Sequence, residues 1–172
     1  QGLSRLALPT LQKELGSCPQ AAAPTLDRLQ TSLALPDTER AELAELAETA
    51  RALKGNAKTD ALLRIFETFP DPMVGFTQFR ETPNYLGRRL EEAGIRTVLL
   101  HGGLSRLEKE EAIETFRREA RVLLSTETGS EGGNLQFCHA ICNFDLPWNP
   151  MRIEQRIGRL SRIGQVRDVY VF

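Results

Sequence analysis

The most chemically specific stretch of the sequence is QRIGRLSRIGQ, which occupies residues 155–165. If this stretch is helical, a turn of about 100° per residue brings Gln155, Arg159 and Arg162 onto one narrow face. Two guanidinium groups and an amide on a rigid face suit a polyphosphate, because arginine offers planar, multi-point hydrogen bonding at fixed charge. The alternative is an ordinary solvated helix face, which arginines alone would favour. The neighbouring sequence has to decide between the two interpretations.

The flanking residues predict that this helix spans residues 150–163. Asn149 is typical of a helix N-cap, Pro150 of the first helical position and Gly164 of the residue that ends a helix. The face opposite the arginines is apolar and consists of Ile153, Ile157 and Leu160. The helix is therefore expected to bury hydrocarbon on one side and to present its arginines on the other.

Composition excludes several classes of protein. The chain has 172 residues, of which 41% are hydrophobic and 26% charged, with a formal net charge of −1. This size suits one domain, with or without an appendage, and near-neutrality means that any DNA contact must come from a local basic patch. No apolar run reaches membrane-spanning length and no signal peptide is evident, so we expect no membrane partner. Because the chain stops inside an apolar run, we expect a piece of a longer protein.

The cysteines indicate a reducing compartment. Cys18, Cys138 and Cys142 are odd in number and lack the spacing of a disulfide framework, so reduced thiols in a cytosolic protein are expected. Cys138, His139 and Cys142 could suggest zinc, but a fourth ligand is missing and the surrounding residues are apolar. We therefore expect buried thiols and no metal site.

The chain has two parts with different sequence patterns, and the boundary between them is expected after residue 57. The first part is helical, with helices expected over 8–15, 25–33 and 37–53 and a break at 18–24. The second part opens with a helix over 59–69 and then alternates between strands and helices. Strands are expected at 73–77, 97–100, 121–125, 140–144 and 169–172, with helices over 83–92, 105–119, 132–137 and 150–163.

Such alternation predicts an α/β fold, with a parallel sheet flanked by helices on both faces. Ligands of such sheets bind at the carboxyl ends of the strands. The polar clusters of this sequence all follow strands, at residues 77–78, 101–103, 126–133 and 145–150. We therefore expect a site at that edge.

One of these clusters is rich in glycine. Gly129, Gly132 and Gly133 alternate with polar residues and are expected to open a helix. Glycines let the backbone approach a phosphate or a ribose closely, and free amides at a helix start favour anions. The alternative is a helix entry that needs a positive φ. Asp145 ends a strand, as a magnesium-holding acid would, but this chain has no phosphate loop to accompany it.

Three stretches together resemble helicase motifs V and VI of superfamily 2. They are TETGSEG at 126–132, DLPWNP at 145–150 and QRIGRLSRIGQ. WNP and RIGQ resemble the Swi/Snf-type ATPases, and SEGGNLQF with FDLPWNP most resembles the bacterial RapA/HepA-like branch. Upstream, MVGFTQFRET and LLHGGLSRLEKEEAIETF are similar to motif IV and the strand–loop–helix that follows it. The resemblance covers residues 58–172, and residues 1–57 resemble loosely the helical connector between two ATPase lobes.

This resemblance implies a two-lobed motor that binds ATP with Mg²⁺ between RecA-like lobes. The chain is similar to the C-terminal lobe, so the N-terminal lobe would supply the phosphate loop, the magnesium carboxylate and the general base. Arg159 and Arg162 would be arginine fingers, and Gln155 would order the phosphate and the attacking water. Alone, the chain is not expected to hydrolyse ATP.

The resemblance also implies two groups of binding residues. Those beside the nucleotide are Glu131, Gly132, Asn134 and Arg156, and Arg156 would also hold the helix or its neighbouring motif. Those at the DNA backbone are Thr126, Gln78, His101, Gly102, Gly103 and Trp148. Two residues depart from the family pattern: Glu127 stands where many relatives carry a basic residue, and Gly133 replaces a larger one.

The resulting prediction is a bacterial, cytoplasmic and nucleoid-associated ATPase that translocates on double-stranded DNA without separating the strands. Its expected partners are duplex DNA and the N-terminal lobe, with RNA polymerase as a further candidate. Two alternatives stay open. One is a non-catalytic RecA-like module that docks on a partner such as RNA polymerase. The other is a small-molecule enzyme, which would need a nucleophile–base pair or cofactor motif that this sequence lacks.

Overall fold

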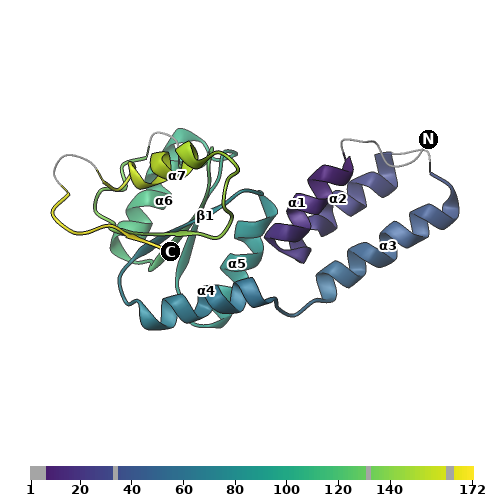
Figure 1. Ribbon diagram of the computed structural model, residues 1–172, viewed down its shortest axis with the longest axis horizontal. Helices are drawn as coiled ribbons and strands as arrows, with labels where there is room; N and C mark the ends of the chain where they lie inside the picture. Colours follow the sequence, from purple (N-terminus) through teal and green to yellow (C-terminus); the bar gives the residue numbers. More distant parts are fainter. Residues whose placement is uncertain (1–6, 33–34, 131–132, 162–164) are drawn as a thin grey trace. The chain divides into compact units, whose positions relative to one another are not determined.

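The structure is a computed structural model that describes residues 7–32, 35–130, 133–161 and 165–172 (Figure 1). The chain divides into two compact units, Gln1–Asp60 and Ala61–Phe172. This division lies close to the boundary expected after residue 57. The role of the first part as a connector between lobes stays a prediction.

The first unit consists mainly of three helices, α1 (Ala7–Ser17), α2 (Pro19–Ser32) and α3 (Asp37–Ala52). Its core is formed by Leu11, Ala22, Leu26, Leu43 and Ala47. The break expected at 18–24 is found at Cys18, between α1 and α2, but is wrong for the rest of that range, because α2 continues through Pro24. The three alanines that precede this proline are almost completely buried, so close packing outweighs the roughly 3 kcal/mol that a proline costs inside a helix.

The second unit is built on a five-stranded sheet in which every pair of neighbouring strands is parallel. The strands are β1 (Met73–Thr77), β2 (Thr97–Leu100), β3 (Val122–Thr126), β4 (Ala140–Asn143) and β5 (Tyr170–Val171). Their order is β2-β3-β1-β4-β5. The expected α/β class is confirmed.

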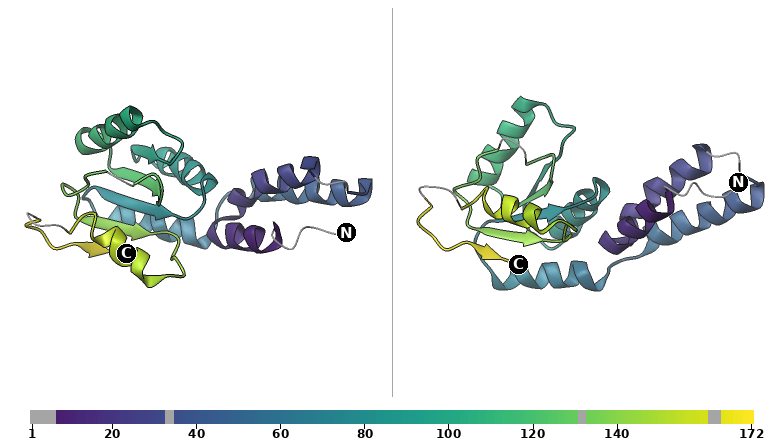
Figure 2. Two further views of the ribbon diagram at one scale, coloured as in Figure 1. Left: turned by 90° about the horizontal axis from the view of Figure 1, so that it is seen from above. Right: turned by 45° about the horizontal axis from the view of Figure 1, so that its top comes forward.

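Helices flank this sheet (Figure 2). They are α4 (Ala57–Thr68), α5 (Glu81–Glu92), α6 (Arg106–Arg118) and α7 (Pro150–Ile157). Strands β1 and β3 are buried along their whole length, as their unbroken apolar runs predict for the centre of a parallel sheet. The main core lies around them and includes Val74, Phe76, Phe116, Leu123, Leu135, Ile141 and Leu160.

Side chains fix the ends of two helices. Ser105 and Glu108 form a capping box at the start of α6, in which Ser105 Oγ accepts the Glu108 N–H and Glu108 Oε2 accepts the Ser105 N–H. These hydrogen bonds lower the pKa of Glu108. At the carboxyl end of α4, Arg121 Nη2 donates to the carbonyls of Phe66 and Phe69, which ties α4 to the start of β3.

One expected helix is not found. Residues 133–135 have no regular structure and residues 136–137 form a turn, so the helix expected over 132–137 is wrong in its described part. The apolar side chain that suggested it, Leu135, is completely buried as part of an irregular segment. None of the helices in the described ranges is long and apolar enough to cross a membrane.

All three cysteines are buried and none forms a disulfide, as expected. Burial raises the pKa of the Cys138 thiol from 9.0 to about 11, against the opposing effect of backbone hydrogen bonds. The Cys138 Sγ–H faces the carbonyls of Pro72 and Ala140, at 3.1 and 3.4 Å. The described residues contain no cluster of three or more side chains suited to hold a metal.

We expect the thiols of the folded protein to react slowly with a disulfide reagent at about pH 8, because the reactive thiolate is disfavoured by burial. Full reaction should follow unfolding in guanidinium. The pKa of Cys138 is higher in the folded than in the unfolded protein. The contribution of this thiol to stability is therefore complete below pH 9.0 and is lost as the pH rises towards about 11. Rapid labelling of Cys138 in the folded state would contradict this assignment.

Candidate functional site

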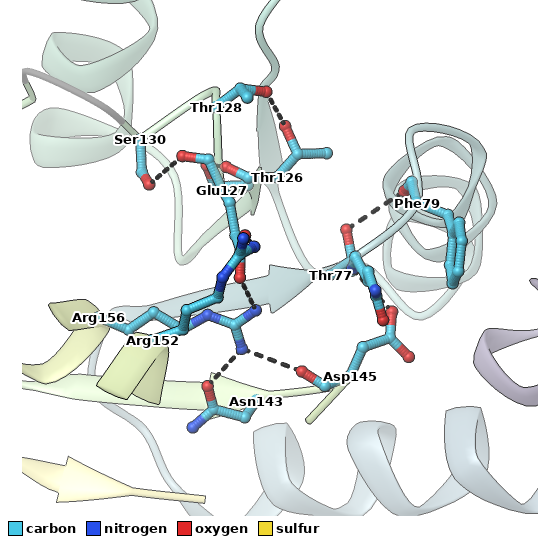
Figure 3. Close-up of polar contacts among 12 residues, drawn as sticks. Thr77, Phe79, Thr126, Glu127, Thr128, Ser130, Asn143, Asp145, Arg152 and Arg156 are labelled. Carbon is cyan, nitrogen blue, oxygen red and sulfur yellow. Dashed lines mark hydrogen bonds and ion pairs between the residues drawn. The ribbon is translucent and has the colours of Figure 1, made fainter. Parts of the chain in front are cut away.

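The carboxyl ends of β1, β3 and β4 meet at one edge of the sheet. The register pairs Thr77 with Thr126, and Phe76 with Asn143, so the residues that follow these strands lie side by side (Figure 3). This confirms the expectation that polar residues placed after separate strands converge. The edge is where ligands of open parallel sheets bind.

Asp145 ties two of these strand ends together. Its Oδ2 accepts the backbone N–H of Gln78 at 2.9 Å. The N–H groups of Phe144 and Asp145 both donate to the carbonyl of Phe76. Asp145 is only 6% exposed. This carboxylate therefore anchors the loop after β1 to the end of β4.

Arg156 is the central side chain of the edge. Its Nη1 donates to Asn143 Oδ1 at 2.7 Å and to the Asp145 carbonyl at 3.0 Å, and its Nη2 donates to Glu127 Oε1 at 3.1 Å (Figure 3). The guanidinium carbon lies 5.0 Å from the centre of the Phe76 ring. Burial lowers the pKa of Arg156, and Glu127 opposes this shift, so the ion pair helps to hold the buried charge.

Beside Arg156 lies a pocket of about 270 Å³. It is lined by Glu127, Thr128, Ser130, Arg152, Gln155, Arg156 and Arg159. Arg152 Nη1 also donates to Glu127 Oε2, so one carboxylate faces two guanidinium groups. Three arginines against one carboxylate leave an excess of positive charge, which favours an anionic ligand.

The arginines are positioned by α7, which begins as expected and ends earlier. Asn149 Oδ1 accepts the N–H of Met151 at 3.0 Å, and Pro150 is the first helical residue. The helix ends at Ile157 instead of continuing to 163, and residues 158–160 form a turn. Leu160, which is completely buried, anchors this turn in the core.

Arg159 therefore lies just beyond the helix, and its Nη1 donates to the carbonyl of Ser130 at 2.6 Å. Gln155 is exposed and lines the same pocket. The structure thus brings these two predicted catalytic residues together. Arg162, the third, lies outside the described residues, as do Glu131 and Gly132.

The loop after β3 is folded around Thr126. This residue is 7% exposed, its Oγ1 accepts the N–H of Gly129, and its carbonyl accepts the N–H groups of Gly129 and Ser130. A Cβ on Gly129 would lie 2.0 Å from the carbonyl oxygen of Leu100. Among the described residues only Gly94 has a positive φ, so Gly129 is required for close packing against the end of β2.

The other predicted residues are spread along the edge. His101 Nδ1 accepts the N–H of Gly103, and Gly102 packs against Thr128, so this loop borders the loop after β3. The side chain of Gln78 is exposed. Trp148 is 90% exposed in the segment between β4 and α7. Asn134 is exposed, accepts the N–H of Gln136, and does not line the pocket.

Sequence reasoning placed Arg152 in a basic region but assigned no individual role to Arg152, to Asn143 or to Glu127 as a counter-ion. Arg152 and Arg156 are four residues apart on α7, and this spacing was a usable signal for a second basic stripe. Asn143 gave no signal, because its role depends on the distance between β4 and α7. Gln165 also has a structural role: its Nε2 donates to the carbonyls of Gln136, Cys138 and Leu160.

Residues 57–164 match the family of the helicase conserved C-terminal domain. The chain belongs to this family. It is 37% identical over 171 residues to the uncharacterized ATP-dependent helicase YqhH of Bacillus subtilis, a match that covers 98% of this chain and 31% of YqhH. It is 49% identical over 85 residues to RNA polymerase-associated protein RapA of Vibrio cholerae, which covers 48% of this chain and 9% of RapA.

A solved structure supports the assignment to this family. The E. coli DEAD-box protein SrmB, solved with the regulator of ribonuclease activity A, matches with a TM-score of 0.61 and 28% identity. That match covers 66% of this chain and 67% of the SrmB chain. The expected RecA-like fold of a helicase C-terminal lobe is confirmed. The chain spans less than a third of YqhH, so the activity of the whole protein is a separate question.

We expect Arg156→Met to lower the free energy of unfolding by about 3 kcal/mol, because it leaves Glu127, Asn143 and a carbonyl without their buried donor. Arg118→Met on α6 is the control, since Arg118 is 73% exposed and its loss should cost at most about 0.5 kcal/mol. Urea unfolding of both variants measures the difference. Equal stabilities would show that the buried guanidinium does not hold the edge together.

We expect Gly129→Ala to destabilise the domain by about 2–3 kcal/mol, because the added methyl group meets the backbone of Leu100 and His101. Gly16→Ala in α1 is a matched control: apart from its own helix backbone, no atom lies within 4 Å of the added Cβ, and it should change stability by less than about 1 kcal/mol. Thermal unfolding compares the two. An unchanged Gly129→Ala variant would refute the close packing of the two loops.

Proposed function

We propose that this chain is the second ATPase lobe of an ATP-dependent translocase on double-stranded DNA, of the Swi/Snf type and similar to RapA. The observation that supports this proposal most directly is the arginine-lined pocket at the carboxyl edge of the sheet. Gln155 and Arg159 line it, at positions where helicase motif VI carries its catalytic side chains. The sequence contains no phosphate loop, so ATP would be held mainly by an N-terminal lobe.

In this proposal Arg159 acts as an arginine finger. It is only partly buried and donates to a neutral carbonyl, which a phosphate oxygen can replace at little cost. A guanidinium at that position stabilises the charge that builds up on the transferred phosphoryl group. Arg162 would be the second finger, and Gln155 would orient the attacking water.

The residues present fit phosphate groups and do not form a site for Mg²⁺. The pocket offers guanidinium donors, whereas the described residues contain no cluster of three or more metal-binding side chains. Mg²⁺ would neutralise phosphate charge when ATP is bound, with its ligands supplied by the N-terminal lobe. Glu131, Gly132 and Asn134 are proposed to lie beside the ribose. Arg156 is proposed to position the helix and not to bind the nucleotide itself, since its terminal nitrogens are already engaged.

DNA contacts are proposed for the loops along the same edge. Thr126 organises the loop after β3, and residues 101–103 form a second loop that packs against it. Gln78 presents an exposed amide beside these loops. Trp148 adds an exposed aromatic surface. Contacts of this kind to the phosphate backbone position a protein without reading sequence. The protein would then act in the bacterial cytoplasm, at the nucleoid.

A second candidate is a docking module for RNA polymerase without catalytic activity. It is favoured by the similarity to RapA, a protein that is named for its association with RNA polymerase. Residues 1–57, which we propose to be a connector between the lobes, could instead carry such a contact. The two candidates differ in ATPase activity.

We expect the intact protein to hydrolyse ATP and duplex DNA to stimulate this hydrolysis, whereas the isolated chain should be inactive. Steady-state ATPase assays with and without duplex DNA measure this. Activity that is absent under both conditions would reject the motor and favour the docking module.

In the intact protein, Arg159→Ala and Arg162→Ala should each lower kcat by about 100-fold or more, with a smaller effect on nucleotide affinity. Arg118→Ala, on an exposed part of α6, is the control and should keep the wild-type rate. Near-wild-type stimulated turnover in both finger variants would reject the finger assignment.

A further inference from the structure

Arg152 differs from the other two arginines of the pocket in how it is held. Arg156 is 3% exposed and has several protein partners, and Arg159 donates to the Ser130 carbonyl. The side chain of Arg152 is 54% exposed, and its guanidinium is held by the carboxylate of Glu127. It is therefore the pocket arginine that can change partner most easily.

Glu127 forms two ion pairs that differ in burial. One of its oxygens accepts from buried Arg156 and the other from exposed Arg152 (Figure 3). The bond to Arg156 is costly to break, because this guanidinium is 3% exposed and would lose its charged partner. The bond to Arg152 lies at the surface, where ion pairs are weak. A stronger anion would therefore displace Glu127 from Arg152 and leave its bond to Arg156 in place.

A phosphate group is the anion that suits this exchange. The terminal phosphate of ATP carries more charge than a carboxylate and offers three oxygens, and a DNA phosphodiester carries one charge and offers two free oxygens, so a guanidinium can bind either with two hydrogen bonds. Gln155 and Arg159 line the same pocket and add donors to it. We propose that Arg152 is a further phosphate-binding residue of the arginine pocket, held by Glu127 until a phosphate group replaces the carboxylate.

This inference deepens the proposed function and rests on it, because the phosphate would come from ATP or from the DNA backbone. The two sources are distinguished in the intact protein by measuring KM and kcat for ATP, and duplex affinity at several salt concentrations. Arg152→Gln should raise KM for ATP about tenfold if the phosphate belongs to ATP, and should weaken duplex affinity about tenfold if it belongs to DNA. If the source is DNA, the slope of log Kd against log salt should also fall by about 0.9.

Glu127→Gln tests the holding role. The amide keeps an oxygen that accepts from Arg156 but removes the charge that attracts Arg152. We expect this variant to bind the same ligand several-fold more tightly, and the gain to vanish in the double variant Glu127→Gln, Arg152→Gln. Glu114→Gln and Arg118→Gln, an exposed pair on α6, are matched controls and should change neither affinity.

Three results separate the possibilities. If Arg152→Gln changes neither KM for ATP nor duplex affinity while the wild type is active, the phosphate role is wrong and the proposed function stands. If the gain of Glu127→Gln survives without Arg152, the holding role is wrong. If the wild type neither hydrolyses ATP nor binds duplex DNA, the proposed function is wrong, and the phosphate role of Arg152 is rejected with it. Because Arg152 is exposed, its variant is expected to fold even if Glu127→Gln is too unstable to measure.

Discussion

The arrangement of this edge depends on one buried guanidinium. Arg156 joins the loop after β3, the end of β4 and helix α7, and it lies over an aromatic ring of β1. A buried charge is tolerated only where its donors meet acceptors of suitable geometry. The positions of Glu127, Asn143 and the Asp145 carbonyl are therefore coupled to that of α7. The contact between Arg156 and Glu127 connects the loop after β3 with α7, the two segments that border the pocket.

Around this fixed centre the charges differ in how firmly they are held. Arg156 is 3% exposed and its bond to the Asp145 carbonyl is buried, and Asp145, which accepts the Gln78 N–H, is 6% exposed. The contacts of Arg152 and Arg159 are partly open to water and involve a shared carboxylate and a neutral carbonyl. Such a site is rigid where its geometry is set and exchangeable where a ligand would bind. This combination is what preorganised binding of an anion requires.

The sequence predicted elements best where local signals and burial agree. β1 and β2 have the expected bounds, because continuous apolar runs between turn residues leave few alternatives. The errors arose where tertiary packing decides: α2 passes through Pro24, residues 133–137 form no helix, and α7 stops at Ile157. Helical spacing predicted that Gln155 and Arg159 lie together, although Arg159 lies in the turn after α7. The partners of Arg156 could not, since they come from segments brought together only by the sheet.

The strand order has a consequence for how the domain is made. β1 is the first strand in the chain, yet its neighbours are β3 and β4, and β2 at the edge pairs only with β3 among the described strands. During synthesis, β1 and β2 therefore emerge as apolar segments with no partner until β3 has left the ribosome. Non-local pairing of this kind is slow and exposes strand edges to other chains. The nascent chain is thus most vulnerable to aggregation before β3 has emerged to pair with β1 and β2.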